Sequence, residues 1–115
     1  MRRAFAVTAM ILASLPGPSS AQSKGIRLWN LTTATMTGFQ LSPAGQNNWG
    51  PNQTLNDKDK ELDHDERLKL SGVEPGRYDA KVSYAGDRQC IVRGLDIKAD
   101  AVVSIADKDL KECTK

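Results

Sequence analysis

Apolar and polar residues alternate along the second half of the chain. One set of alternate positions in residues 77–85 is apolar: Tyr78, Ala80, Val82 and Tyr84. A period of two is typical of an antiparallel strand with one face buried and the other face in water. Shorter alternations at residues 88–97 and 101–106 follow after the turn residues 86–87 and 98–100. The pattern therefore predicts three consecutive strands.

Residues 26–41 predict two further strands. The stretch 26–33 is rich in β-forming residues, and its apolar residues fall on both faces, which is typical of a central strand. Trp29 within it is expected to pack in the core, because Trp is mostly buried. Residues 36–41 follow after a short link and are expected to pair with the first strand as a hairpin.

The remaining pattern completes an all-β fold. Residues 68–70 return to alternation, and Gly94 is expected to form a bulge because the apolar phase shifts across it. About six short strands result, without a convincing helix in the domain. Strands of this length, separated by regular turn signals, predict a small antiparallel β-sandwich or a small barrel.

The first 21 residues are predicted to be a signal peptide. Arg2 and Arg3 precede a short apolar run at residues 4–15, and small residues Ser19 and Ala21 mark a cleavage site after Ala21. The apolar run is too short to span a bilayer as a helix, so no stable membrane insertion is expected after cleavage. Residues 22–115 then form a single domain, periplasmic or secreted, and either general or twin-arginine export fits the leader.

Charge and cysteine usage narrow the class of protein further. The chain has 16 basic and 14 acidic residues, and two of the basic ones lie in the leader, so the domain itself is neutral. A neutral domain has no general attraction for nucleic acid. Cys90 and Cys113 form an even pair in an exported protein, which predicts a disulfide. A zinc site is the alternative, but their spacing fits no zinc motif and His64 is the only histidine.

One long loop interrupts the strands at residues 42–56. It is rich in Pro, Gly and Asn, and it carries Trp49 at its centre. In one interpretation Trp49 closes an open end of the sandwich, with its indole N–H bonded to a loop carbonyl. In the other, the Trp and its neighbouring amides form a platform for a carbohydrate or a peptide. The candidate ligand residues are Asn47, Asn48, Trp49, Asn52 and Gln53.

An acidic run follows the loop. Its carboxylates occupy alternate positions: Asp57, Asp59, Glu61, Asp63 and Asp65. Oxygen ligands at this spacing suggest a calcium site, although the glycine of an EF-hand loop is missing and Lys58 and Lys60 offset the charge. The alternative is a solvated segment that keeps a sheet edge soluble. No other cofactor is expected.

Catalytic chemistry is not expected. His64 has no nucleophile beside it in a recognisable motif, and both cysteines are assigned to the disulfide. Paired carboxylates occur only within the mixed-charge run, where nothing apolar would raise a pKa. The sequence therefore predicts a protein that is not an enzyme.

Two resemblances add to this interpretation. Residues 68–86 are similar to the strand–turn–strand core of transthyretin-like and carboxypeptidase-regulatory-like sandwiches, which implies a transthyretin/Ig-like fold. The matching positions are Gly72, Val73, Pro75, Gly76, Tyr78, Ala80 and Val82. A longer pattern resembles an uncharacterised family of small exported bacterial proteins, which implies an export signal and a compact β-domain. Its positions are Ser42-Pro43, Asn48-Trp49-Gly50, Asn52, Tyr78-Asp79, Lys81, Cys90 and Cys113.

Together these features predict an exported, non-enzymatic binding or structural module of the bacterial envelope. The expected partner is a protein or a carbohydrate, and the expected surface is the 42–56 loop with the acidic run beside it. One alternative is a calcium-dependent module that uses the acidic run. Another is an inhibitor or accessory subunit of an envelope enzyme, which would bind through the same loop.

Overall fold

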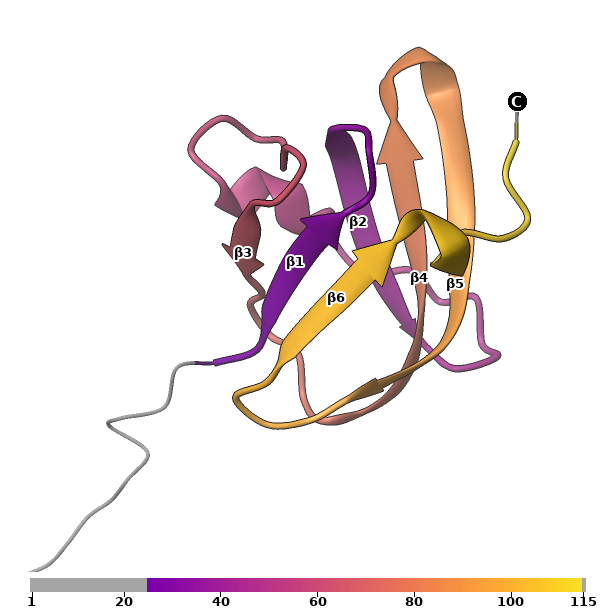
Figure 1. Ribbon diagram of the computed structural model, residues 1–115. Coiled ribbons are helices and arrows are strands. Elements are labelled where there is room, and N and C mark those ends of the chain that lie inside the picture. Colours follow the sequence, from indigo (N-terminus) through magenta and orange to yellow (C-terminus); the bar gives the residue numbers. More distant parts are fainter. Residues whose placement is uncertain (1–24, 115) are drawn as a thin grey trace, which may run out of the picture.

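The computed structural model of the protein describes residues 25–114, which form two three-stranded sheets packed face to face (Figure 1). The predicted signal peptide, residues 1–21, lies outside the described residues. One sheet has the order β3-β1-β6 and the other the order β2-β4-β5. The strands are β1 (Arg27–Leu31), β2 (Met36–Pro43), β3 (Arg67–Lys69), β4 (Gly76–Tyr84), β5 (Arg88–Ile97) and β6 (Val102–Ala106). Three short 3-10 turns are η2 (Gln53–Asn56), η3 (Ala85–Asp87) and η4 (Asp107–Asp109). The predicted all-β sandwich of six strands is confirmed.

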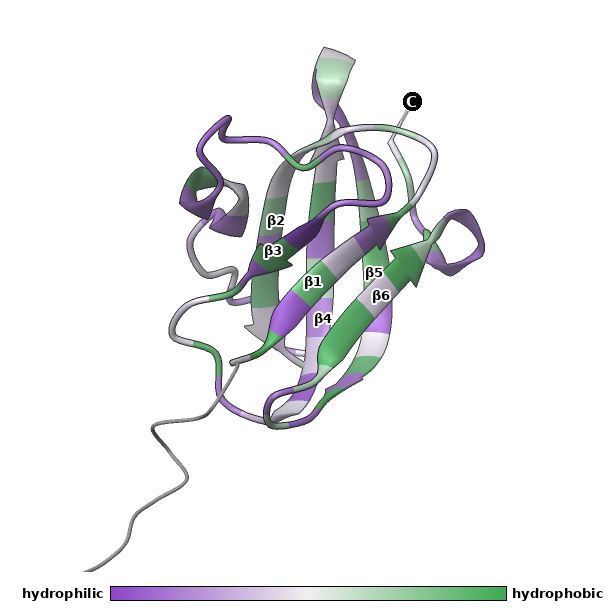
Figure 2. Ribbon diagram, turned by 60° about the vertical axis from the view of Figure 1, so that its left-hand side comes forward, coloured by the Kyte–Doolittle hydropathy of each residue, from purple (hydrophilic) through white to green (hydrophobic). Residues whose placement is uncertain are grey.

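The core lies between the two sheets. Alternate residues of each strand point inward, and apolar segments recur along the strands in Figure 2. Leu28 in one sheet and Phe39 and Val82 in the other are completely buried. Each such side chain contributes roughly 1.5–3 kcal/mol relative to an exposed position. The period of two in the sequence is therefore the signal of this core.

The predicted hairpin between the first two strands is wrong, because β1 and β2 belong to different sheets. The chain crosses between the sheets at residues 32–35, where the side chain of Asn30 turns inward. Its Oδ1 accepts a hydrogen bond from the Thr32 amide at 2.9 Å, and its Nδ2 donates to the Ala34 carbonyl at 3.0 Å. Asn30 is completely buried, and its bonds hold the crossover that takes the place of the predicted hairpin turn.

The sandwich is not purely antiparallel, which corrects a second expectation. β6 pairs with β1 in parallel, with Arg27 opposite Val102 and Leu31 opposite Ala106. All the other strand pairs are antiparallel. The two parallel strands are far apart in the sequence, so no short turn dictates their relative direction. The prediction that residues 26–33 form a central strand is confirmed, since β1 lies between β3 and β6.

Trp29 was expected to lie in the core, and the structure corrects this expectation. Its neighbour Leu28 points inward, so Trp29 lies on the outer face of the sheet and is half-buried. Its indole N–H donates to Asp65 Oδ1 at 3.0 Å, and the Arg67 guanidinium lies 4.0 Å from the ring centroid. Asn30 and Thr32 take the inward positions that follow Leu28, because they carry the polar turn.

The bulge at Gly94 is confirmed. The register between β4 and β5 shifts between Tyr78 and Ala80, whose partners are Leu95 and Val92. Gly94 has a φ of 69°, a left-handed conformation that glycine adopts without strain. The bulge turns the Gly94 amide toward the side chain of Asp79 at 3.1 Å.

The disulfide is also confirmed, and it attaches the C-terminal tail to β5 through Cys90 and Cys113. Beside it, Ile91 and Lys111 exchange two backbone hydrogen bonds of 2.8 Å. The tail thus covers the edge of β5 around Gln89 and Ile91. A disulfide in a small domain is typical of proteins that fold in oxidising compartments outside the cytoplasm. In the part of the chain described here, no helix has the length and apolar character needed to cross a membrane.

Candidate functional site

Residues 44–52, here called the anchored loop, lie against the outer face and the free edge of the β2-β4-β5 sheet. The Gly50 amide donates to the Leu41 carbonyl at 2.8 Å, and Gln40 Nε2 donates to the Gly50 carbonyl at 2.9 Å. Gln40 and Leu41 belong to β2, so the loop is attached at Gly50 to the strand that precedes it. The loop is therefore ordered by specific bonds rather than by apolar packing alone.

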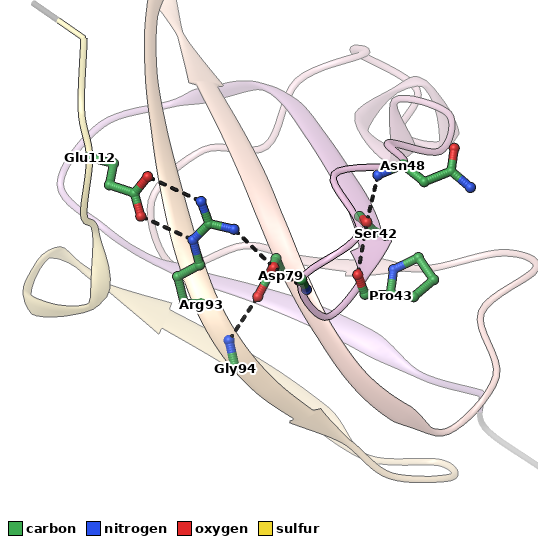
Figure 3. A network of polar contacts seen from close by, with 8 residues as sticks. Ser42, Pro43, Asn48, Asp79, Arg93, Gly94 and Glu112 are labelled. Atoms are coloured by element: carbon green, nitrogen blue, oxygen red, sulfur yellow. Dashed lines mark hydrogen bonds and ion pairs between the residues drawn. The ribbon is translucent and has the colours of Figure 1, made fainter.

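Asp79 fastens the first part of the loop. The residue lies on the outer face of β4 but is only 3% exposed, because the loop covers it. Its carboxylate accepts hydrogen bonds from the Gly45 amide at 2.9 Å, the Gly94 amide at 3.1 Å and Arg93 Nη1 at 3.0 Å. Figure 3 shows Asp79 between Arg93 and Gly94. The sequence pattern had placed Asp79 on a solvent face, and only its place in the Tyr78-Asp79 family pattern marked it as unusual.

Arg93 extends this network to the C-terminal tail. Its Nε and Nη2 bond to the two carboxylate oxygens of Glu112 at 3.0 and 3.1 Å (Figure 3). A two-pronged pair of this kind fixes orientation as well as distance. Asp79 and Arg93 thus connect three separate segments: the anchored loop, the bulge and the tail.

The electrostatics of the network favour its charged state. The Gly45 amide lowers the pKa of Asp79 below its ordinary value of 3.8, and the Gly94 amide and Arg93 add to the effect against the opposing desolvation. Hydrogen bonds to Glu112 and Asp79 raise the pKa of Arg93. The bond from Arg93 lowers the pKa of Glu112. All three groups are therefore ionised at neutral pH.

Ser42 fastens the second part of the loop. Its Oγ accepts a hydrogen bond from the Asn48 amide at 2.8 Å and donates to the Pro43 carbonyl at 2.9 Å (Figure 3). Ser42 is completely buried and lies opposite Asp79 in the β2–β4 register. The two polar residues therefore act side by side under the loop, although they are far apart in the sequence.

Asn52 closes the loop on the free edge of β2. Its Oδ1 accepts a hydrogen bond from the Phe39 amide at 2.9 Å, and its Nδ2 donates to the Thr37 carbonyl at 3.3 Å. Further along, Met36 exchanges two backbone bonds of 2.9 Å with Leu62. An uncovered strand edge is a template for aggregation, and these contacts cover it. Leu62 is completely buried, although the sequence surrounds it with charge.

Gln53, the first residue of η2, ties the segment that follows the loop to the segment after β3. Its Oε1 accepts from the Ser71 amide and its Nε2 donates to the Ser71 carbonyl, both at 3.0 Å. Gln53 is 4% exposed. Among the predicted ligand residues, Asn52 and Gln53 therefore hold the fold together, and the exposed side chains of Asn47 and Asn48 remain at the surface.

Trp49 lies on the outer face of the sheet, not over an open end of the sandwich as one interpretation expected. It is half-buried, and Lys81 Nζ lies 5.0 Å from its ring centroid. Lys81 points outward because its neighbours Ala80 and Val82 are in the core. The cation lies over the ring, and only part of Trp49 is accessible to solvent.

A small cavity opens beside the loop. Its volume is about 190 Å³, and it lies between Pro51 and Val73, with Leu41 and Tyr78 among the residues that line it. Tyr78 is fixed by a hydrogen bond from its hydroxyl to the Glu74 carbonyl at 2.7 Å. Pockets for whole small molecules have volumes of roughly 300–1,000 Å³. This cavity is smaller than that range, and its volume matches a single amino-acid side chain.

In the structure, the carboxylates of the acidic run contact different partners. Asp57 accepts a hydrogen bond from the Asp59 amide at 2.8 Å, Asp63 from the Thr35 hydroxyl at 2.8 Å, and Asp65 from the Trp29 indole. Glu61 is exposed. Within residues 25–114, no three carboxylate, cysteine or histidine side chains gather into a group that could hold a metal ion.

We expect the thermal midpoint of unfolding to be the same in millimolar calcium and in EDTA. The reason is that the five carboxylates do not converge and that Lys58 and Lys60 lie between them. Calorimetry in the two buffers at equal ionic strength makes the comparison. A midpoint that rises with calcium and falls back on chelation would show that the run binds the ion.

Asn52→Ala is expected to lower the free energy of unfolding by about 1–2 kcal/mol, because the Phe39 amide loses its acceptor at the β2 edge, whereas the Thr37 carbonyl keeps the bond from the Thr54 hydroxyl. Asn48→Ala is the matched control, since its exposed side chain makes no such bond, and it should change stability by less than about 0.5 kcal/mol. Urea unfolding measures both. Equal losses in the two variants would contradict the edge-covering role.

The chain was compared with known proteins and families. No family model, no curated protein and no solved structure matches it. The geometry of the site is therefore the basis for the functional argument.

Proposed function

We propose that this protein is an exported, non-enzymatic binding module of the bacterial envelope that contacts its partner through the anchored loop. The observation that carries the proposal is the way the loop is fixed: Asp79, Ser42 and Asn52 hold its backbone at separate points. A surface that is ordered before binding loses little conformational entropy when a partner arrives. The exposed amides of Asn47 and Asn48 and the accessible part of Trp49 are the groups available for contact.

The size of the cavity beside the loop favours a protein partner. A volume of about 190 Å³ suits one inserted side chain, and the surrounding Pro51 and Val73 suit an apolar one. A carbohydrate would need an open aromatic face for stacking, and the cation of Lys81 already lies over Trp49. The leader, the disulfide and the resemblance to small exported bacterial proteins support the envelope as the location, either periplasmic or secreted.

The arrangement of charged groups supports a role other than catalysis. Asp79 is the buried carboxylate of the site, and all the hydrogen bonds it accepts come from the fold itself. Its pKa is lowered, whereas a general acid or base that works near neutral pH needs a raised one.

Site-specific photo-crosslinking in intact cells tests the proposal. A photoreactive amino acid in place of Asn48 is expected to give a discrete crosslinked protein, and the same group in place of Lys58, exposed on the acidic run, should not. Trp49→Ala introduced alongside the Asn48 probe should remove the product, because it removes part of the contact surface. The same products from both positions, or a product at Asn48 that survives Trp49→Ala, would contradict binding through the loop.

A further inference from the structure

The outer edge of β6 differs from the other long edges of the sandwich in its backbone groups, some of which point away from the sheet. The Arg27 amide donates to the Ala101 carbonyl at 3.0 Å, which sets the phase of the parallel pairing. In a parallel pair, every second residue of a strand bonds to the neighbouring strand. In β6 these residues are Val103 and Ile105, so the backbone groups of Val102 and Ser104 point away from β1. Among residues 25–114 no strand pairs with that side, because β6 is the last strand of its sheet.

Other parts of the molecule cover their edges. Asn52 and Leu62 cover β2, and the tail covers β5 through Lys111. At the end of β6, the Ala106 amide is bonded to Asp109 Oδ2 at 2.9 Å. The open stretch is therefore short, and it centres on Ser104.

A cleft runs along this open stretch. Its volume is about 480 Å³, and it separates β6 at Ser104 from residues 92–95 of β5. Figure 2 shows β6 and β5 next to one another at this side of the sandwich. Val92 and Leu95 supply apolar lining, and the volume is within the range of sites that bind ligands. The cleft lies at a seam between the two sheets and shares no lining residue with the cavity beside the anchored loop.

The rim of the cleft carries basic side chains. Arg93, Lys108 and Lys111 line it, against the single carboxylate of Asp109. Arg93 is neutralised by Asp79 and Glu112, so the lysines supply the attraction. Lys108 is 3.4 Å from Asp109 in a pair whose lysine side chain is 83% exposed. Such an exposed pair is weak and can exchange for another carboxylate.

We propose that the free edge of β6 binds an extended acidic segment of a partner protein as an additional strand. Backbone bonds to Val102 and Ser104 would supply affinity, as in other cases of strand addition. An apolar side chain of the segment would contact Leu95, which is half-buried, and its carboxylates would contact Lys108 and Lys111. Charge selects the occupant: two copies of this edge would bring their lysines together, which disfavours self-pairing and basic segments.

The probe is a short capped peptide that alternates glutamate and valine, compared with a peptide that alternates lysine and valine. Amide hydrogen exchange of the purified protein is measured with each peptide by NMR. The acidic peptide should slow exchange at Val102 and Ser104, whose amides point away from β1, and leave Val103 and Ile105 nearly unchanged because they already bond to β1. The basic peptide should slow neither pair.

Three variants separate strand addition from simple charge attraction. Ser104→Pro removes an amide that the sheet does not use, so it should keep the fold and abolish binding. Lys108→Glu/Lys111→Glu should weaken binding about tenfold and reduce its salt dependence. Lys58→Glu/Lys60→Glu, which makes the same change of net charge at two exposed positions of the acidic run, should have no effect. The Lys108→Glu/Lys111→Glu variant still tests the proposal if Ser104→Pro unfolds.

The proposal is overturned by any of three results. The first is equal protection by the acidic and basic peptides, and the second is protection that the double lysine variant does not reduce. The third is binding of the acidic peptide without protection of Val102 and Ser104, which would indicate surface charge attraction only.

Discussion

Replacing both cysteines, as Cys90→Ala/Cys113→Ala, is expected to lower the free energy of unfolding by about 3 kcal/mol. The disulfide closes a loop with a sequence separation of 23, and the unfolded chain gains conformational freedom when this loop is opened. Urea or thermal unfolding measures the loss. For a domain of this size, it corresponds to a fall in midpoint of roughly 12–24 °C.

Hydrogen exchange shows where the loss arises. Without the disulfide, the tail should separate from β5, so the Ile91 and Lys111 amides, each of which donates to the other residue's carbonyl, should exchange faster. The Val82 amide in β4 reports on the sandwich itself and should stay protected under native conditions. A cysteine-free variant with unchanged stability and a protected Lys111 would show that the tail is held without the bond.

Asp79→Asn is expected to lower the free energy of unfolding by about 2–3 kcal/mol at neutral pH. The amide cannot accept hydrogen bonds with both of its terminal atoms, so the Gly45 or the Gly94 amide loses its acceptor, and Arg93 loses a charged partner. Chemical unfolding measures the effect. Asp96→Asn is the matched control, because Asp96 lies in β5 in an exposed pair with Lys98 and should change stability by less than about 1 kcal/mol.

The same residue gives stability a dependence on pH. The pKa of Asp79 in the folded protein is below its ordinary value of 3.8. Its stabilisation is therefore complete above that value and is lost as pH falls through the lower folded pKa. The difference in stability between the wild type and Asp79→Asn should shrink as the pH is lowered from 5 toward 2. A constant difference over that range would contradict the role of the charge.

Local signals in the sequence predict much of this fold. Alternation of apolar residues gives β4 and its inward face, because the side-chain period of a strand is two. A shift in that phase identifies Gly94 as a bulge, since the extra residue reverses the inward and outward positions. The cysteine pair predicts the link between Cys90 and Cys113, because exported domains of this size are commonly disulfide-bonded.

Contacts between distant segments are the part that the sequence does not reveal. The parallel pairing of β1 with β6 joins the two ends of the domain, and no turn between them encodes it. Asp79 reads as a solvent-facing residue of an amphipathic strand, and only the loop that folds over it makes it buried. In the same way, Asn52 and Gln53 look like available amides until the β2 edge and Ser71 are placed beside them.

Amide hydrogen exchange within the anchored loop tests the central claim most directly. The Gly45, Asn48 and Gly50 amides bond to Asp79, Ser42 and Leu41 respectively. We predict that these amides exchange orders of magnitude more slowly than the neighbouring Asn47 amide, and that Asp79→Asn removes the protection at Gly45. Uniformly fast exchange from Gly45 to Gly50 would show that the loop is mobile, and would contradict an ordered binding surface on this face of the sheet.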